Sequence, residues 1–386
     1  MKQSILFVSE TVPGNFIASS VLFFRHLTWL EGKGYSINVF PWGDNWKFQN
    51  LPDTWNVIDT SIRKWWYLPY RPDSFLRWVR YKMLLADYRS AILEREPTAI
   101  FTHLSGQYYS GFAAFLSERL NIPLYIFYHD NTEKMNYKSN PAMYQLQAAF
   151  NQRIVQQATA IWSISDQLVY PGTERKTHRV FPVPEPINGK AVWRPAFRDA
   201  PIVGFAGSLY DQIVPATIRF VKVLERLNGT LIIFSPVARN VQLLQEASKA
   251  VVVMPVATSR FVCEYMIEHC SSFLVNYPET VADMPWIDSN FPSKFTQFLQ
   301  TGLPVLCQVP ADSAIGIWCR NSGYSAYTDR FDEEGTAGLI RQSTDESRWK
   351  ALAAESIRFS ETEFNPETIN QVLISDLKDG QKSLRS

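Results

Sequence analysis

The sequence predicts an α/β protein with two doubly wound domains, and three observations lead to this prediction. Strand patterns alternate with helical patterns through the first half of the chain. Prolines interrupt that alternation between Phe181 and Pro201, and the alternation starts again at Ile202. The length of 386 residues also favours two domains, because a single core rarely grows beyond about 250 residues.

In the first half, short and nearly all-apolar runs predict strands of a parallel sheet, because helices cover both faces of such a sheet. Longer segments with apolar residues at helical spacing lie between these runs. The predicted strands are Ser4–Ser9, Ser36–Phe40, Ala99–Thr102, Leu124–Tyr128 and Ala160–Ser163. The predicted helices are Ala18–Leu30, Ser74–Leu93, Tyr108–Leu120 and Met143–Gln157.

A proline-rich segment separates the two predicted domains, because prolines leave little room for a helix or a central strand. The second half repeats the alternation, with strands at Ile202–Phe205, Thr230–Phe234, Val251–Met254 and Phe273–Val275 and helices at Ala216–Leu227 and Arg260–Cys270. We expect domains at 1–185 and 202–365, a linker at 186–201, and a C-terminal helix within 366–386 that crosses back to the first domain. Alternatively, the proline-rich segment is a long surface loop inside one domain and not a linker between two domains.

Composition indicates a folded protein without a global charge that would attract nucleic acid or an anionic membrane. The chain is 46% hydrophobic and 19% charged, and its net charge is +1. Its four cysteines show no spacing typical of zinc ligands, which indicates reduced, buried thiols. The first apolar run is short for a signal peptide, and no segment approaches the roughly 20 apolar residues that span a bilayer. The sequence therefore predicts a cytoplasmic protein.

The segment Phe291–Leu306, FPSKFTQFLQTGLPVL, is typical of a loop, a short helix and a buried strand. Pro292 and Ser293 suit the start of the helix, and Gly302 suits its end. A helix start with a lysine in its first turn offers free N–H groups and positive charge to an anion. We therefore predict that Lys294 and Ser293 bind a diphosphate, with a solvated lysine as the alternative.

A glycine-containing turn, GFAGSLYDQ at residues 204–212, follows the strand that opens the second half. Gly207 and Ser208 would let the backbone approach a phosphate closely, although a plain tight turn fits as well. Together the two motifs resemble the nucleotide-sugar site of GT-B-fold glycosyltransferases of the family 4-like (group 1) kind. The resemblance implies two Rossmann-like domains facing each other across a cleft, a nucleotide-diphosphate-sugar donor, taken as a UDP-sugar, and neither cofactor nor metal.

The chain departs from this family at two positions. Gln297 stands where many members have a Glu that accepts from the ribose hydroxyls, and Ser289 stands where retaining members have another Glu. Asp283 and Asp288 could substitute only if the loop is arranged differently. A glutamine still accepts hydrogen bonds, so Gln297 remains a predicted donor-binding residue. The segment Phe291–Leu306 also resembles the corresponding segment of the bacterial xanthan glucuronosyltransferase. That protein is an inverting GT-B enzyme with a Lys and a Gln in this segment.

His129 and Asp130 directly follow the predicted strand Leu124–Tyr128. An Asp beside a His can accept a proton from a sugar hydroxyl. The resemblance implies a base at the position of Asp130 and a donor-sugar contact at that of His129. We therefore predict Asp130 as the base and His129 as donor contact or orienter. The alternatives are a helix cap and a satisfied buried imidazole.

Four further residues are weaker candidates. Gly14 and Asn15 lie where the family has a glycine-rich turn that closes over the donor phosphates, which implies donor binding. Glu10 and His103 each end a predicted strand and could contact the acceptor or face the cleft. A loop cap for Glu10 and a structural role for His103 are the alternatives.

Basic and aromatic residues alternate through Ile62–Lys82, IRKWWYLPYRPDSFLRWVRYK. This mixture suits a peripheral contact with an anionic membrane, here the inner face of the plasma membrane. A lid over an acceptor sugar, or a helix that packs its aromatic rings inward, fits the same composition. No recognised nucleic-acid motif accompanies it.

We therefore expect a metal-independent, hexosyl-type glycosyltransferase that uses a nucleotide-sugar donor. The expected acceptor is a glycan or lipid-linked molecule in cell-surface polysaccharide biosynthesis. The alternatives are a GT-B-fold sugar-nucleotide epimerase and a catalytically silent glycan-binding or scaffold protein.

Overall fold

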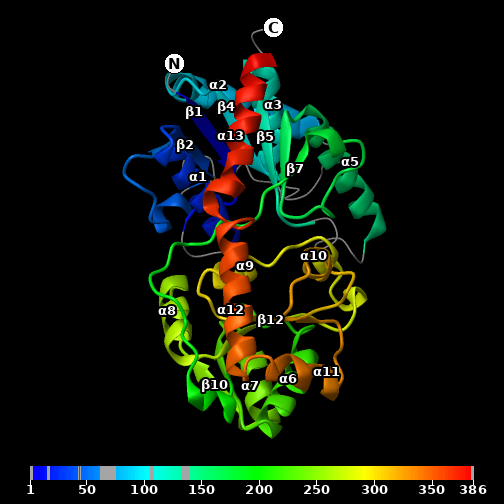
Figure 1. Ribbon diagram of the computed structural model, residues 1–386. Coiled ribbons are helices and arrows are strands. Elements are labelled where there is room, and N and C mark those ends of the chain that lie inside the picture. Colours follow the sequence, from blue (N-terminus) through cyan, green and yellow to red (C-terminus); the bar gives the residue numbers. More distant parts are fainter. Residues whose placement is uncertain are drawn as a thin grey trace. The chain divides into compact units, whose positions relative to one another are not determined.

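The computed structural model describes residues 3–14, 18–41, 43, 45–60, 75–104, 108–131 and 140–383. The chain divides into two compact units, and Figure 1 labels helices and strands of both. Unit 1 comprises Met1–Val180 and Ile369–Ser386, and unit 2 comprises Phe181–Thr368. Residues 186–201 fall within unit 2, where the amide of Ala191 donates to the carbonyl of Thr301 (2.8 Å).

Unit 1 is built on a parallel sheet of seven strands among the described residues, in the order β3-β2-β1-β4-β5-β6-β7. The order reverses between β1 and β4, and α/β sheets bind ligands at the carboxyl ends of strands beside such a reversal. The strands are β1 (Ser4–Ser9), β2 (Ser36–Pro41), β3 (Asn56–Val57), β4 (Ala99–His103), β5 (Leu124–Tyr128), β6 (Ala160–Ser163) and β7 (Thr177–Arg179).

The helices of unit 1 include the C-terminal one. In order they are α1 (Ala18–Gly32), α2 (Phe75–Glu94), α3 (Tyr108–Leu120), α5 (Pro141–Gln157) and α13 (Pro366–Ser383). Helix α13, red in Figure 1, bonds to three strands of the sheet, including β7, where Nδ1 of His178 lies 2.8 Å from the Asp376 carboxylate. The Tyr125 hydroxyl donates to the carbonyl oxygen of Asp376 (3.3 Å), and Trp162 Nε1 donates to its carboxylate (2.8 Å). Helix α13 thereby contributes Asp376 to the core of the first unit.

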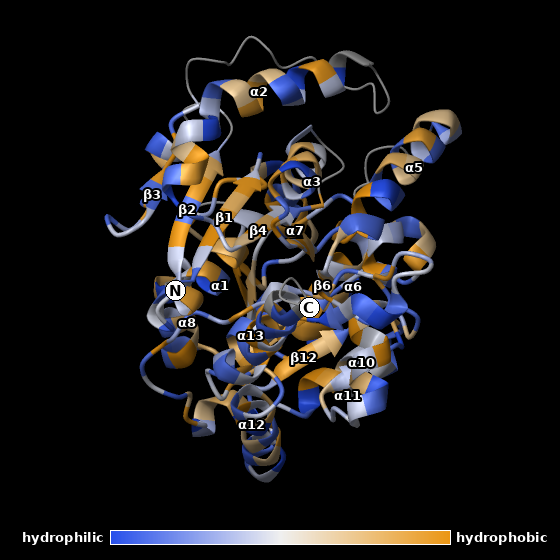
Figure 2. Ribbon diagram, turned by 90° about the horizontal axis from the view of Figure 1, so that it is seen from above, coloured by the Kyte–Doolittle hydropathy of each residue, from blue (hydrophilic) through white to orange (hydrophobic). Residues whose placement is uncertain are grey.

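Aromatic rings fill much of that core. Phe101 and Phe127 each lie 4.8 Å from the ring of Trp162, measured between centroids, and all three side chains are fully buried. Every residue of β1, β4, β5 and β6 is buried, as a sheet covered on both faces requires. Figure 2 shows β2 as a largely hydrophobic strand, whereas α13 alternates between polar and apolar residues.

Unit 2 repeats the design with a parallel sheet of six strands among the described residues, in the order β10-β9-β8-β11-β12-β13. Its strands are β8 (Ile202–Ala206), β9 (Thr230–Phe234), β10 (Val251–Met254), β11 (Ser272–Asn276), β12 (Val305–Gln308) and β13 (Tyr327–Thr328). Its helices are α6 (Val214–Arg226), α7 (Ala238–Ala247), α8 (Ser259–His269), α9 (Ser293–Leu299), α10 (Ala314–Ser322), α11 (Glu333–Arg341) and α12 (Glu346–Glu361). The prediction of an α/β protein with two parallel sheets is confirmed.

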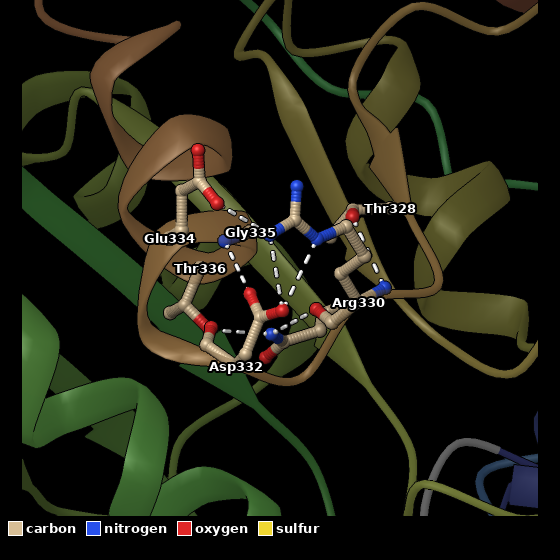
Figure 3. Close-up of polar contacts among 7 residues, drawn as sticks. Thr328, Arg330, Asp332, Glu334, Gly335 and Thr336 are labelled. Carbon is tan, nitrogen blue, oxygen red and sulfur yellow. Dashed lines mark hydrogen bonds and ion pairs between the residues drawn. The ribbon is translucent and has the colours of Figure 1, made fainter.

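Two local arrangements fix the ends of elements in unit 2. The Phe298 ring of α9 stacks on Phe273 of β11 at 3.6 Å between centroids, and both side chains are buried. Figure 3 shows the start of α11, where Asp332 accepts from the amide of Gly335 (2.7 Å) and from Arg330 (3.0 Å). Such a cap satisfies a helix N–H that has no partner within the helix.

Candidate functional site

Unit 2 brings together the two motifs that the sequence predicts to bind the donor. Gly207 follows β8 with φ at +129°, a conformation that favours glycine. A Cβ added to Gly207 would lie 3.4 Å from Lys294 Cε, so the turn and the lysine are neighbours. Ser208 is exposed, and Ser293 and Lys294 are half-buried. The arrangement places an ammonium-bearing side chain against a backbone that can approach a ligand closely.

Side chains from the next strand and helix hold the turn after β8 in place. The hydroxyl of Ser235 accepts from the amide of Leu209 (3.3 Å), and Asn240 Nδ2 donates to the Leu209 carbonyl (2.7 Å). The amide of Gly207 itself donates to the carbonyl of Phe234 (2.9 Å). The backbone of this turn is therefore shaped before any ligand arrives.

Gln297 lies on the same short helix as Lys294 but faces a different part of the chain. Its Oε1 accepts from the amide of Glu185 (2.7 Å), and its Nε2 donates to the Glu185 carbonyl (3.1 Å) and approaches Cys263 Sγ (3.6 Å). The side chain is buried. Both ends of the Gln297 amide thus hold the first segment of unit 2 at Glu185.

Replacing Gln297 with Glu, the residue that many family members carry, is expected to destabilise unit 2 by about 2 kcal/mol. The carboxylate would keep the bond from the Glu185 amide but would set an acceptor against the Glu185 carbonyl. Urea unfolding measures the effect, with Gln245→Glu on the exposed face of α7 as the matched control. Unchanged stability together with tighter donor binding would contradict this structural role.

In the loop before α9, the two candidate carboxylates differ in exposure, with Asp288 half-buried and Asp283 at the surface. Ser289 is buried, and its hydroxyl points to the carbonyl of Trp286 (3.4 Å). Asp283 is exposed and accepts from the Thr280 hydroxyl (2.8 Å).

Unit 1 buries His103 and His129 at the ends of β4 and β5. Their ring centroids lie 6.2 Å apart at an interplanar angle of 89°. A third imidazole, His26 of α1, lies 6.4 Å from His129, and the ring of Phe23 contacts both strand-end histidines. We call His26, His103 and His129 the histidine cluster. His26 is not recognisable as a site residue from the sequence, because one histidine inside an apolar helix gives no signal of its own.

All three imidazoles of the histidine cluster are neutral near pH 7. Burial lowers the pKa of His103 from 6.5 to about 4. Burial also lowers the pKa of His26 to about 4, although its bond to Asn370 acts in the opposite direction. For His129, burial and then the two neighbouring imidazoles hold the pKa well below 6.5. His129 therefore presents an uncharged ring to its surroundings.

The remaining predicted residues of unit 1 take varied positions. Asp130, next to His129, is half-buried. Glu10 Oε1 accepts from the amide of Tyr109 (2.6 Å), which caps the start of α3. Gly14 donates its amide to the carbonyl of Ser20 (3.1 Å), and a Cβ at Gly14 would collide with Gln49. Asn15 lies outside the described residues.

Most of the basic and aromatic segment, residues 61–74, lies outside the described residues. Helix α2 carries its remainder, where Tyr81 is buried and Trp78 is 42% exposed with Lys82 Nζ 3.6 Å above its ring. Helices in the described part of the chain include none long and apolar enough to cross a membrane. Within the same residues, no group of three His, Cys, Asp or Glu side chains is arranged to hold a metal ion.

Solved glycosyltransferases share this arrangement of strands and helices over the whole chain. A sucrose-phosphate synthase from Thermosynechococcus elongatus superposes with a TM-score of 0.71 at 15% identity, covering 100% of both chains. The chain has the GT-B fold. Other GT-B structures include a glycosyltransferase from Rickettsia africae ESF-5, with a TM-score of 0.66, 11% identity and 99% of each chain covered. MurG from Acinetobacter baumannii superposes with a TM-score of 0.55 at 10% identity, covering 98% of this chain and 99% of MurG. No protein-family model and no curated protein matches the sequence.

Proposed function

We propose that the protein is a glycosyltransferase that moves a hexosyl group from a nucleotide-diphosphate sugar to a glycan or lipid-linked acceptor. The observation that carries the proposal is the approach of Lys294 to the Gly207 turn at the carboxyl end of β8. Beside the strand-order reversal of a doubly wound sheet, this is where a phosphate is expected to bind. The sucrose-phosphate synthase, MurG and other glycosyltransferases that share the fold support the reaction class.

In the proposed reaction, unit 2 binds the donor and unit 1 supplies the base. Lys294, with the turn at Gly207 and Ser208, stabilises the negative charge that develops on the departing diphosphate, without a metal. Asp130 takes the proton of the acceptor hydroxyl while the oxygen forms its bond to the anomeric carbon and the bond to the diphosphate breaks. His129 is assigned the role of orienting this site, which suits a buried and neutral ring.

A donor-hydrolysis and transfer assay across UDP-, GDP- and dTDP-sugars tests the proposal. Turnover with one donor class, reduced at least about 100-fold by Asp130→Ala, supports a transferase with Asp130 as its base. Donor binding without turnover would instead indicate a glycan-binding or scaffold protein, a reading that the engagement of Gln297 with Glu185 favours. Reversible isomerisation of the sugar nucleotide would indicate an epimerase.

We propose in addition that the protein acts in cell-surface polysaccharide biosynthesis in the cytoplasm, with Ile62–Lys82 touching the inner face of the plasma membrane. The exposed ring of Trp78 beside Lys82 supports this assignment, since indole rings and cations favour the headgroup region. Co-sedimentation with anionic but not zwitterionic vesicles, weakened by Trp78→Ala, is expected. Equal recovery with both vesicle types would exclude an electrostatic membrane contact.

A further inference from the structure

The histidine cluster contains more buried polar atoms than its neighbours satisfy. Both ring nitrogens of His103, both of His129 and Nε2 of His26 are buried without a hydrogen-bond partner among the described residues. Within the described part of the chain, the one hydrogen bond of the cluster goes to the C-terminal helix, where Nδ1 of His26 donates to Oδ1 of Asn370 (2.7 Å). Because an amide oxygen can only accept, this bond places the proton of His26 on Nδ1 and leaves Nε2 as an acceptor.

Buried nitrogens of this kind require a partner. Leaving a buried donor or acceptor unsatisfied costs about 1–3 kcal/mol, so proteins pair such groups with one another or with ordered water. The imidazoles do not bond directly, and the nearly perpendicular rings of His129 and His26 are 6.4 Å apart between centroids. A bridging water with two hydrogen bonds of about 2.8–3.0 Å fits such a separation. Neutral imidazoles supply both the donors and the acceptors that a buried water needs.

We propose that Asn370 and His26 are positioning residues, which set the tautomer of His129 through water held between the imidazoles. The bond to Asn370 directs Nε2 of His26 towards accepting a water O–H, and the remaining hydrogen bonds of that water decide which nitrogen of His129 carries its proton. The hydrogen bond at one nitrogen of a histidine fixes the state of the other. We call this coupling of Asn370 and His26 to the tautomer of His129 the link. The role of His129 in catalysis rests on the proposed function, whereas the link does not.

Two variants of the full chain test the link in histidine-labelled protein by ¹⁵N NMR, which distinguishes the two tautomers. Asn370→Leu removes the oxygen that accepts the hydrogen bond of His26 Nδ1, whereas Asn370→Asp retains an acceptor oxygen. Asp376→Asn is the matched control, because it disturbs the anchoring of the same helix to Trp162 without touching the cluster. We expect Asn370→Leu to change the ring nitrogen shifts of His129, and Asn370→Asp and Asp376→Asn to retain the wild-type tautomer.

Kinetic measurements on the same variants distinguish a positioning role of Asn370 from a general loss of structure. Asn370→Leu is expected to lower kcat on the order of tenfold while the donor KM stays unchanged, and Asp376→Asn is expected to leave both unchanged. Equal effects of Asn370→Leu and Asp376→Asn on the His129 signals would overturn the proposal. If no donor is turned over, the proposed function fails, but the NMR comparison still decides the link. Should Asn370→Leu not fold, a crystal structure of the unaltered protein decides instead: a water between His26 Nε2 and His129 supports the link, and direct packing refutes it.

Discussion

Unit 1 is expected to lose most of its stability as the pH falls from 6.5 to 4, while unit 2 remains folded above pH 5. In the unfolded chain the imidazoles take up protons near pH 6.5, whereas in the folded unit His26 and His103 do so near pH 4, and burial holds the pKa of His129 well below 6.5. Between these values the unfolded state binds more protons, so acidification favours unfolding. His26 and His103 each contribute about 1.4 kcal/mol per pH unit, or about 3 kcal/mol by pH 4, and His129 acts in the same direction. The sum is comparable with the whole stability of a domain, about 5–15 kcal/mol.

Hydrogen exchange of the intact chain, read by mass spectrometry, measures this effect in each unit separately. Amides of β4 and β5 should lose protection between pH 6.5 and 4.5, after correction for the intrinsic exchange rate, and those of β11 and β12 should not. The variant His103→Leu removes one titrating group and should reduce the pH dependence by about one proton. His269→Gln, which alters the half-exposed histidine of unit 2, is the control and should change nothing. Equal pH dependence in both units would contradict the assignment to the histidine cluster.

The central strands of both sheets were predictable because each is a short apolar run that the fold buries, whereas the short edge strands β3, β7 and β13 are partly exposed and were missed. The start of β12 at Val305 and the bounds of β5 and β6 follow from this pattern alone. Helix α7 was missed, since only a few apolar residues in ARNVQLLQEA mark its buried face. Helix α6 begins at Val214 instead of Ala216, because proline is tolerated in the first turn.

Residues of the candidate site were predictable only where they belong to a local sequence pattern. The Gly207 turn and the Lys294 helix each carry a local pattern, and the fold places them side by side. The engagement of Gln297 could not be foreseen, because its partner Glu185 lies far away in the chain and is bonded through its backbone. The same reason hid the contact between His26 and Asn370. Bonds of this kind depend on tertiary placement rather than on residue spacing.

Lys294→Ala is expected to lower turnover by about 10²–10³-fold and to weaken the binding of a nucleoside diphosphate by about 10- to 100-fold. The ammonium group lies beside the Gly207 turn, where it would neutralise a diphosphate as the sugar departs. Calorimetric titration with UDP, GDP and dTDP, and then with the corresponding nucleosides, localises the effect. Only the diphosphates should lose affinity, because a nucleoside carries no group for Lys294 to bind. Lys249→Ala, at an exposed position in the same unit, is the control.

The glycine partner of Lys294 gives an independent test of the same site. Gly207→Ala adds a Cβ 3.4 Å from Lys294 Cε at a φ of +129°, which side-chain-bearing residues rarely adopt, so the turn must shift and diphosphate affinity should fall. Gly338→Ala in α11 meets no atom within 4 Å and should leave binding unchanged. If Gly207→Ala and Lys294→Ala both bind diphosphates as the unaltered protein does, the phosphate lies elsewhere. If nucleosides and diphosphates lose affinity equally, the two residues shape the pocket for the base, because a contact with the diphosphate cannot weaken a ligand that lacks it.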